Sequence, residues 1–420
     1  MRGTHTPALN DHLTASSRHR DRGLMTALTR YRTALALPGM ARVMGAAFAC
    51  RLLAGMVVLA LLLVAHRTTG SYASAGAVSG AYAVALAFTS PLWGRIADRR
   101  GPRTALAVAS VLQSTCFTLF VLTAMTQPWP PALTVLAFLA GACTPPAGAI
   151  SNTVIARVTD EEAKRTLFSL SGLLTETVFI AGPLIVAGVV AVLAPIYAVV
   201  VTAVTSAAGT WWLRGARAVL AIELDRPEHG ESLALHRNPR LAHLLAVVVL
   251  GAFSLGALEV SLVAHADGLR MSAGVLLAAM ACGGAVGSFL YGGTRLPGSP
   301  LLQLVGALTL FGLLVATIGL GPGVVATLVV LAVAGAVNGP SDALQTMLVG
   351  DYSTDGTKSQ AFAVLIAANW VGFAAGNGIA GVLVERYSPG AGAAAAAVTT
   401  VVAAGSLLVP LARKRTPVAG

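Results

Sequence analysis

The sequence has 420 residues, of which 56% are hydrophobic and 11% are charged, and its formal net charge is +11. Soluble domains carry about 25% charged residues, so this composition excludes an ordinary soluble protein and indicates one embedded in a membrane. Attraction of one face to anionic lipid headgroups accounts for the positive charge, and no nucleic-acid partner is needed.

The first 40 residues are polar and basic, and they lack an apolar core followed by a cleavage site. We therefore expect no secretory signal. Two alternatives stay open: a basic N-terminal tail, or a shorter segment before the first span if translation begins at Met25.

Twelve apolar stretches follow, each long enough for the roughly 20 helical residues that cross a hydrocarbon core of about 30 Å. We expect helices over about residues 41–66, 71–94, 104–125, 131–156, 166–192, 194–214, 241–264, 272–292, 300–320, 322–348, 359–384 and 389–411. The runs are too continuously apolar for the alternation of a membrane β-barrel. The sequence therefore predicts an all-α integral membrane protein.

A polar segment between the sixth and seventh stretches indicates two halves of six helices. Shifting the chain by 194 residues aligns Pro146 with Pro340 and Phe179 with Phe373, as expected for an internal repeat. The expected divisions are a tail (1–40), a first bundle (41–214), a cytoplasmic linker (215–240), a second bundle (241–412) and a basic tail (413–420).

Basic residues concentrate on one side of the expected bundle. Arg95, Arg99, Arg100 and Arg103 share a single loop on the side of the N-terminus. Cytoplasmic loops carry such an excess of basic residues. We therefore expect a multi-pass protein of the inner (cytoplasmic) membrane with both termini in the cytoplasm.

The loop after the second stretch reads Gly94-Arg95-Ile96-Ala97-Asp98-Arg99-Arg100-Gly101-Pro102-Arg103. It resembles the loop between helices 2 and 3 of the major facilitator superfamily (MFS), Gly-x-x-x-Asp-Arg-x-Gly-Arg/Lys-Arg/Lys, although Pro102 replaces one basic residue. The resemblance extends over residues 38–412. It implies twelve helices in two pseudo-symmetric six-helix bundles that rock about a central site, with helices 1, 4, 7 and 10 around the cavity and helices 2, 5, 8 and 11 at the sliding interface.

Five residues of this loop are candidates for a conformational switch. We expect Gly94 to allow a close approach of a neighbouring helix and Gly101 to allow a turn barred to bulkier residues. The resemblance implies that Asp98 lies near the start of helix 11, where the helix dipole favours an anion, and engages a basic residue such as Arg99 or Arg103. A loop that only sets topology is the alternative.

Four ionisable residues lie inside the expected spans, where an unpaired charge costs several kcal/mol. Arg51 and Glu176 both fall near mid-depth, so we expect them to interact. This pair either couples transport to protons or forms a permanent salt bridge. Glu259 either serves the cavity, as a proton carrier or a contact for a cationic substrate, or reaches external water. Asp342 is a candidate for proton coupling, for the cavity or for a gate.

Polar residues near the middle of the expected helices are candidates for the substrate cavity. Asn338, Ser341, Asp342 and Gln345 share one face of helix 10, because residues three and four apart stack on a helix. The complete set of polar and aromatic cavity candidates is Thr144, Ser151, Asn152, Asn338, Ser341, Gln345 and Trp370.

The direction of transport depends on a weaker pattern. Gly182-Pro183 resembles the Gly-Pro stretch that family exporters carry in helix 5, although Val178 and Val186 stand where the stricter form has glycine. The spans are rich in alanine, valine and leucine, which favours an apolar or amphipathic cargo. A drug or metabolite exporter driven by protons is the preferred hypothesis, and an uptake symporter for a small nutrient is the alternative.

A non-transporting membrane protein or enzyme finds little support, because the sequence has no P-loop, HExxH or GxSxG motif. We expect no cofactor and no metal site, since the cysteines lack metal-ligand spacing. The expected partners are a small-molecule substrate, protons and the lipid bilayer, and the expected assembly is a monomer.

Overall fold

The computed structural model of the protein describes residues 31–126, 129–220, 238–293, 297–353 and 358–413, and every regular element within these ranges is a helix. The described helices are α2 (Met40–Thr69), α3 (Tyr72–Arg100), α4 (Pro102–Thr126), α5 (Pro130–Ala142), α6 (Ala147–Ala156), α7 (Glu161–Val192), α8 (Ile196–Arg214), α9 (Arg217–Leu220), α10 (Pro239–Leu269), α11 (Ala273–Gly293), α12 (Pro300–Ile318), α13 (Val324–Tyr352), α14 (Lys358–Arg386) and α15 (Pro389–Arg413). Among the described residues, 12 spans are long and apolar enough to cross a membrane. The predicted all-α fold is confirmed.

Capping residues in the sequence set where several helices begin. The side chain of Asp160 accepts a hydrogen bond of 3.0 Å from the backbone amide of Glu162, at the start of α7. Asn238 caps α10 in the same way, and Pro239 follows it at the first helical position. Both patterns are typical of helix N-termini, where a side chain satisfies an otherwise free amide and proline loses nothing.

The fourth span is broken into α5 and α6 by Thr144, Pro145 and Pro146. Proline has no N–H group, so Pro146 cannot donate to the carbonyl of Ala142 as a helical residue would. The indole N–H of Trp93 donates to that carbonyl at 2.7 Å instead. Gln113 donates to the carbonyl of Ala140 at 3.3 Å and to the hydroxyl of Thr144 at 3.0 Å, so neighbouring helices satisfy the interrupted backbone.

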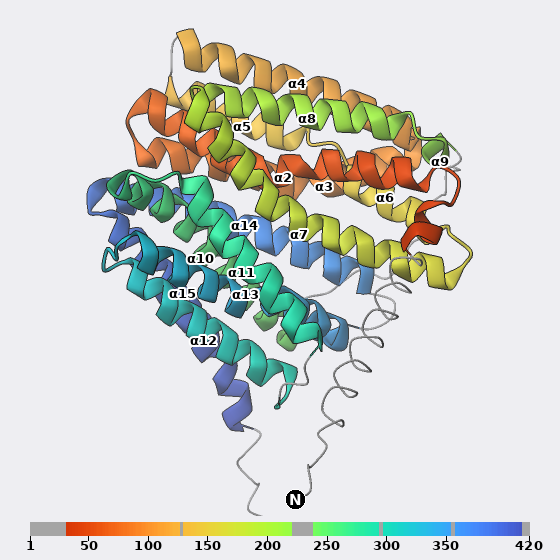
Figure 1. Ribbon diagram of the computed structural model, residues 1–420. Helices are drawn as coiled ribbons and strands as arrows, with labels where there is room; N and C mark the ends of the chain where they lie inside the picture. The colour runs from red at the N-terminus through yellow and green to blue at the C-terminus, as the bar shows by residue number, and fades with distance from the viewer. Residues whose placement is uncertain (1–30, 127–128, 221–237, 294–296, 354–357, 414–420) are drawn as a thin grey trace, which may run out of the picture.

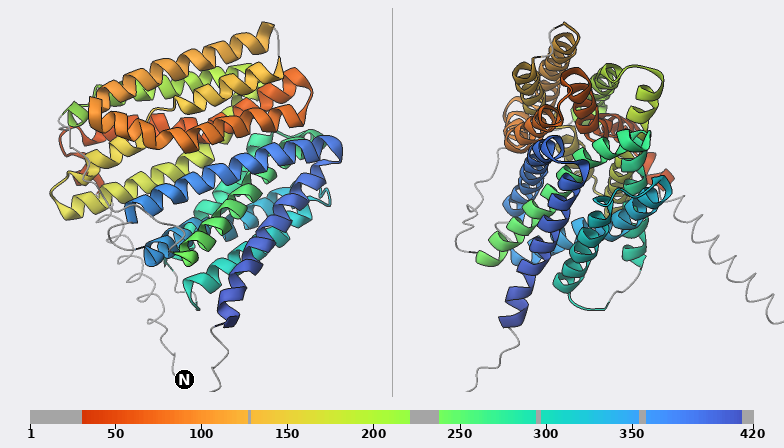
Figure 2. Two further views of the ribbon diagram at one scale, coloured as in Figure 1. Left: turned by 180° about the vertical axis from the view of Figure 1, so that it is seen from behind. Right: turned by 90° about the vertical axis from the view of Figure 1, so that its left-hand side faces the viewer.

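The helices form two bundles, one of α2 to α8 and one of α10 to α15 (Figures 1 and 2). The bundles meet chiefly along two helix pairs, α3 with α14 and α7 with α11. These are the second, fifth, eighth and eleventh spans, which the family resemblance implies as the sliding interface. Within each bundle the first helix, α2 or α10, contacts several of its neighbours.

The bundles share a hydrophobic core at only one end. The largest cluster of buried side chains joins both bundles and includes Leu61 of α2 and Val263 of α10. Over the described residues, a second cluster around Val43 belongs to the first bundle alone, and a third around Leu244 belongs to the second bundle alone. The bundles are therefore packed together at one end and have separate cores at the other.

We call the joined end, which carries the turn between α2 and α3, the linked end. The opposite end carries α9 and the loop with Arg95, Arg99, Arg100 and Arg103, and we call it the basic end. Toward the basic end, the helices of the second bundle slant away from the first (Figures 1 and 2). The structure therefore captures a conformation that is closed at the linked end.

Candidate functional site

A cavity of about 390 Å³ lies between the two bundles, and we call it the central cavity. Six helices contribute to its wall: α2, α7, α10, α11, α13 and α14. Most of the wall is apolar, with three aromatic side chains, Phe179, Trp370 and Phe373. Its volume and apolar lining are typical of a site for a small organic molecule.

Three carboxylates line the central cavity: Glu176 of α7, Glu259 of α10 and Asp342 of α13. Glu176 and Asp342 are close enough for their charges to interact. No described residue donates a hydrogen bond to any of the three side chains or forms an ion pair with one. The predicted placement of these residues inside the bundle is thus observed, and all three lie in one cavity.

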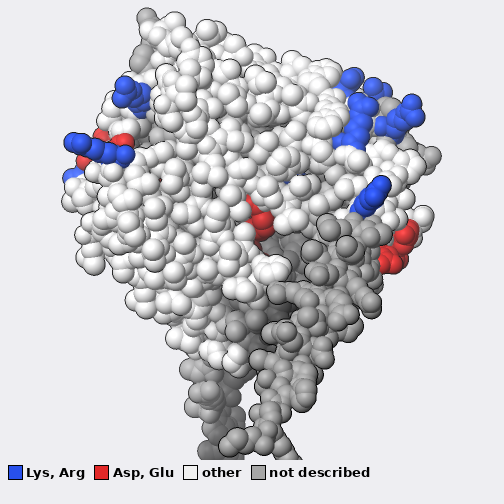
Figure 3. All heavy atoms as spheres, viewed as in Figure 1, with Lys and Arg blue, Asp and Glu red and all other residues white. Residues whose placement is uncertain are grey.

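Charged side chains on the face shown in Figure 3 gather mainly at the two ends of the bundle. A patch of acidic atoms interrupts the uncharged surface about midway between the ends (Figure 3). Glu176, near the middle of α7, is exposed, whereas Glu259 is half-buried. The carboxylates therefore differ in how easily water reaches them.

The predicted contact between Arg51 and Glu176 is wrong in this conformation. The Nη1 group of Arg51 donates to the carbonyl and the hydroxyl of Ser171, at 2.9 and 2.8 Å, and to the hydroxyl of Thr175 at 3.2 Å. Its Nη2 group donates to Ser151 and Asn152 at 3.4 and 3.5 Å. Arg51 thus bridges α2 to α6 and α7 within its own bundle.

Depth alone misled the prediction because it ignores the direction in which a side chain points. Ser171 and Thr175 lie one turn apart on the face of α7 that meets α2, while Glu176 is rotated by about 100° from Thr175 on a helix of 3.6 residues per turn. Glu176 therefore faces the central cavity instead of Arg51.

We expect Arg51→Met and Glu176→Gln to act independently on substrate affinity and transport rate. Residues that share no contact show additive effects within about 0.5 kcal/mol, or roughly twofold. A double-mutant cycle on transport rate measures the coupling. A coupling of tenfold or more would contradict this expectation and would show that Arg51 and Glu176 pair directly, in this or another conformation.

The predicted cavity residues divide into three groups. Asn338 and Trp370 line the central cavity. Thr144 lines a smaller adjoining pocket of about 140 Å³ with Arg51, and Trp370 lies between the two. Ser151 and Asn152 bind Arg51.

Ser341 and Gln345 were predicted to line the cavity, and this is wrong. Their side chains are buried, with 1% and 6% exposure, away from its wall. At this depth Leu344 and Leu348 anchor α13 in the second bundle's own core, so only Asn338 and Asp342 of the predicted polar face reach the cavity.

In the loop proposed as a switch, the turn predicted at Gly101 is confirmed and the close approach predicted at Gly94 is wrong. Gly101 ends α3 with a φ of 90°, a conformation that residues with a side chain rarely adopt. A Cβ at Gly94 would meet no described atom within 4 Å, so the expected close approach is absent while the bundles are apart at this end. Arg99 and Arg103 are exposed, and the side chain of Asp98 lies outside the described part of the chain.

Gly182 and Pro183 lie where α7 meets both α2 and α11. A Cβ at Gly182 would overlap the backbone of Gly55 in α2, and one at Gly274 of α11 would overlap the carbonyl of Pro183. These small residues let helices of both bundles approach by their backbones. Pro183 also lines the central cavity, so the motif joins the bundle interface to the candidate site.

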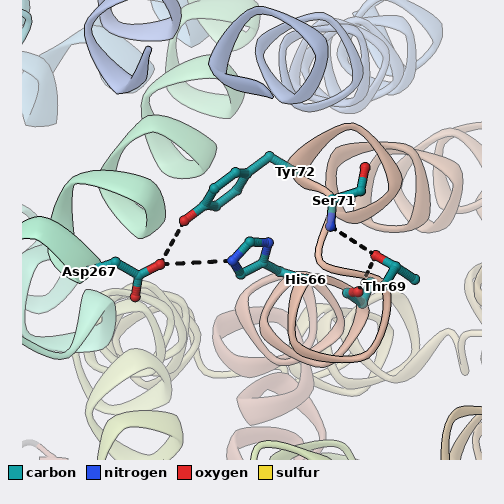
Figure 4. A network of polar contacts seen from close by, with 6 residues as sticks. His66, Thr69, Ser71, Tyr72 and Asp267 are labelled. Atoms are coloured by element: carbon teal, nitrogen blue, oxygen red, sulfur yellow. Dashed lines mark hydrogen bonds and ion pairs between the residues drawn. The ribbon is translucent and has the colours of Figure 1, made fainter. Parts of the chain in front are cut away.

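A polar network that the sequence did not reveal closes the linked end (Figure 4). Tyr72 donates its hydroxyl proton to Asp267 at 2.6 Å, and His66, stacked on the ring of Tyr72, lies 3.8 Å from the same carboxylate. Glu385 accepts hydrogen bonds from the hydroxyl of Ser71 and, at 2.8 Å, from the backbone amide of Ala73. Asp267 and Glu385 belong to the second bundle, and their partners belong to the first.

The contact of Glu385 with α3 is that of a carboxylate at a helix N-terminus, which the exposed amides and the helix dipole favour. No spacing in the sequence connects Glu385 to Ser71, because the two residues come together only when the bundles meet. We name His66, Ser71, Tyr72, Asp267 and Glu385 the linked-end network.

Removal of one contact of this network is expected to open the linked end more often. Tyr72→Phe deletes the hydrogen bond to Asp267, whose exposed position limits its contribution to about 1 kcal/mol, or roughly a fivefold shift in population. The measure is the labelling rate of a cysteine placed at Leu59, in the cavity wall, by a charged thiol reagent added at the linked end. Tyr387→Phe, at an exposed tyrosine of the same end, is the control and should leave the rate unchanged. Equal labelling rates in the two variants would show that the linked-end network does not control opening of this end.

Two helical bundles that share a core at one end only, around a cavity with ionisable side chains, define the architecture of a secondary transporter. The sequence family described as Major Facilitator Superfamily matches residues 43–320, and the chain belongs to this family. It is therefore a multi-pass membrane transporter and not an enzyme. Comparison with curated protein sequences finds no match.

Solved transporters share this fold at low sequence identity. The nucleoside transporter NupG is 16% identical, with 90% of this chain and 100% of that chain covered and a TM-score of 0.64. The human organic anion transporter MFSD10 is 17% identical, with coverage of 88% and 100% and a TM-score of 0.58. A POT family transporter in complex with a thioalcohol-conjugated peptide is 12% identical, with coverage of 90% and 97% and a TM-score of 0.69. At these identities the likeness extends to the fold alone.

Proposed function

We propose that the protein exports a small apolar or amphipathic molecule, such as a drug or metabolite, in exchange for protons. The observation that carries this proposal is the set of three carboxylates in the central cavity that no described residue pairs. A carboxylate inside a membrane span without a cation is costly when ionised, and a proton removes that cost. Glu176, Glu259 and Asp342 are therefore the proposed proton-binding residues, and Arg51 is proposed to position α6 and α7.

The proposed orientation places the basic end in the cytoplasm. The excess of arginine in the loop from Arg95 to Arg103 supports this assignment. The protein would then lie in the inner membrane as a monomer, with both termini and the 215–240 linker on the cytoplasmic side. The proposed bundles are 41–214 and 241–412; the tails and the linker fall largely outside the described residues.

Two features support export over uptake. The wall of the central cavity is mainly apolar, which suits a molecule that partitions into membranes. Gly182-Pro183, similar to the family's exporter pattern, lies at the junction of both bundles beside this cavity. The substrates named for the structural neighbours differ from one another, so none of them is transferred to this chain.

Everted membrane vesicles provide the test, because their basic end faces the medium in the proposed orientation. Vesicles acidified inside by respiration should accumulate amphipathic dyes from a panel of cationic, neutral and anionic compounds, and a protonophore should abolish the accumulation. Vesicles without the protein are the control.

Three outcomes would contradict the proposal. Dye accumulation that continues in the presence of the protonophore would show that transport is not driven by protons. If accumulation of every dye equals that in the control vesicles, the protein does not export such compounds. Proton-driven accumulation of a nutrient in right-side-out vesicles would favour the uptake alternative.

A further inference from the structure

The wall of the central cavity carries charge of one sign. Among the described residues that line it, the three ionisable ones are all acidic, and none is a lysine, arginine or histidine. The protein as a whole has a net charge of +11. The cavity is thus an acidic site inside a basic protein.

Two nearby basic side chains point elsewhere. Arg51 is engaged by acceptors on Ser151, Asn152, Ser171 and Thr175, and it lines the smaller pocket. The ring of His265, farther along α10, lies 3.4 Å from the hydroxyl of Thr327. Neither residue offers a positive group to an anion in the central cavity.

The carboxylate of Glu259 has no hydrogen-bonding or charged partner among the described residues. Its side chain is half-buried in the cavity wall, and no described residue bonds to it. Ionisable residues inside membrane spans ordinarily pair with one another, with backbone carbonyls or with a ligand. A group that comes from outside the chain would complete the site.

The rest of the wall selects the kind of cation. Trp370 and Phe373 meet edge to face, with ring centroids 6.1 Å apart, and both line the cavity with Phe179. Aromatic faces attract cations, and a weakly hydrated cation enters an apolar site at lower cost than a compact ammonium or metal ion. A volume of about 390 Å³ also exceeds what a bare ion fills.

We propose that the central cavity binds an organic monocation whose charge is spread over an apolar or aromatic body. Glu259 and Asp342 neutralise the charge, and Trp370 and Phe373 contact the body. This inference rests on the proposed function in taking the central cavity as the substrate site, and it adds the chemical class of the substrate.

The probes are tetraphenylphosphonium and tetraphenylborate, which have nearly the same size and shape and opposite charge. Binding to the purified full-length protein in detergent is measured by calorimetry at neutral pH. We expect tetraphenylphosphonium to bind and tetraphenylborate to bind at least tenfold more weakly. Glu259→Gln and Asp342→Asn should each weaken binding of the cation at least tenfold.

Asp351→Asn is the matched control, because Asp351 is an exposed carboxylate on the same helix as Asp342 and outside the cavity wall. This variant should bind the cation as the wild type does. Glu259→Asp keeps the charge and should recover part of the affinity, and an unchanged melting temperature separates lost binding from lost folding.

Equal or tighter binding of tetraphenylborate would overturn the inference, and so would full cation affinity in a variant that combines Glu259→Gln with Asp342→Asn. Binding in detergent requires neither a gradient nor a direction. Cation-selective binding without proton-driven accumulation in vesicles would therefore leave the inference standing and contradict only the proposed function.

Discussion

Replacing Glu259 with glutamine is expected to reduce proton-driven transport at least 100-fold. Glutamine keeps nearly the same shape and cannot carry a proton or neutralise a cation. Under the proposed function, a proton and a cationic substrate compete for this one half-buried carboxylate in the wild type, so each must leave before the other binds. This proposed competition would make the transporter an exchanger, and its loss would remove the link between substrate and gradient.

The pH dependence of binding follows from the same competition. Substrate affinity in the wild type should fall as pH falls, because protonation removes the negative charge that attracts the cation, with a limit of tenfold per pH unit for each carboxylate that must be ionised. Glu176 and Asp342 face the same cavity, whereas Arg51 and His265 bond to other residues. Glu259→Gln should therefore flatten the dependence without abolishing it.

The measurements are dye accumulation in everted vesicles and substrate affinity between pH 5.5 and 8.5. Asp351→Asn should match the wild type in both. Proton-driven accumulation at the wild-type rate in the Glu259→Gln vesicles would assign the coupling to Glu176 or Asp342.

The sequence predicted those features that depend on local pattern. Twelve apolar runs and a glycine of positive φ at Gly101 follow from the intrinsic properties of the residues concerned. Glu176, Glu259 and Asp342 could be found because charge is rare inside a membrane, and any such residue requires a physical reason.

The partners of these residues could not be found in the same way. Arg51 and Glu176 lie at similar depth, but Arg51 bonds to Thr175, whereas Glu176, the next residue on α7, faces the central cavity. The linked-end network joins residues separated by up to 314 positions, and its members pair only when two bundles pack in one of their conformations. Gly94 has open space beside it for the same reason, since the bundles are apart at its end.

Closure of the linked end depends on a backbone contact between α3 and α14, and a side chain placed there should prevent it. A Cβ at Gly381 would lie 3.1 Å from the Cα atom of Ala73, and one at Gly76 would lie 3.2 Å from the Cα atom of Gly381. Forcing extra atoms into a packed contact costs about 1–3 kcal/mol, or roughly 5- to 150-fold in an equilibrium. Because the contact joins two bundles, the cost applies to the closed conformation and spares the fold of each bundle.

Gly381→Leu is therefore expected to hold the protein open at the linked end and to lower the transport rate at least fivefold. Gly378→Leu is the matched control: it lies on the same helix, one turn away, and a Cβ there would meet no described atom within 4 Å. A cysteine at Leu59 should react faster with a charged reagent from the linked end in Gly381→Leu, and at the wild-type rate in Gly378→Leu. If both variants transport normally, the α3 and α14 helices do not need to approach this closely during the transport cycle. If both fail and their melting temperatures drop together, the effect belongs to folding and the gating role of Gly381 is refuted.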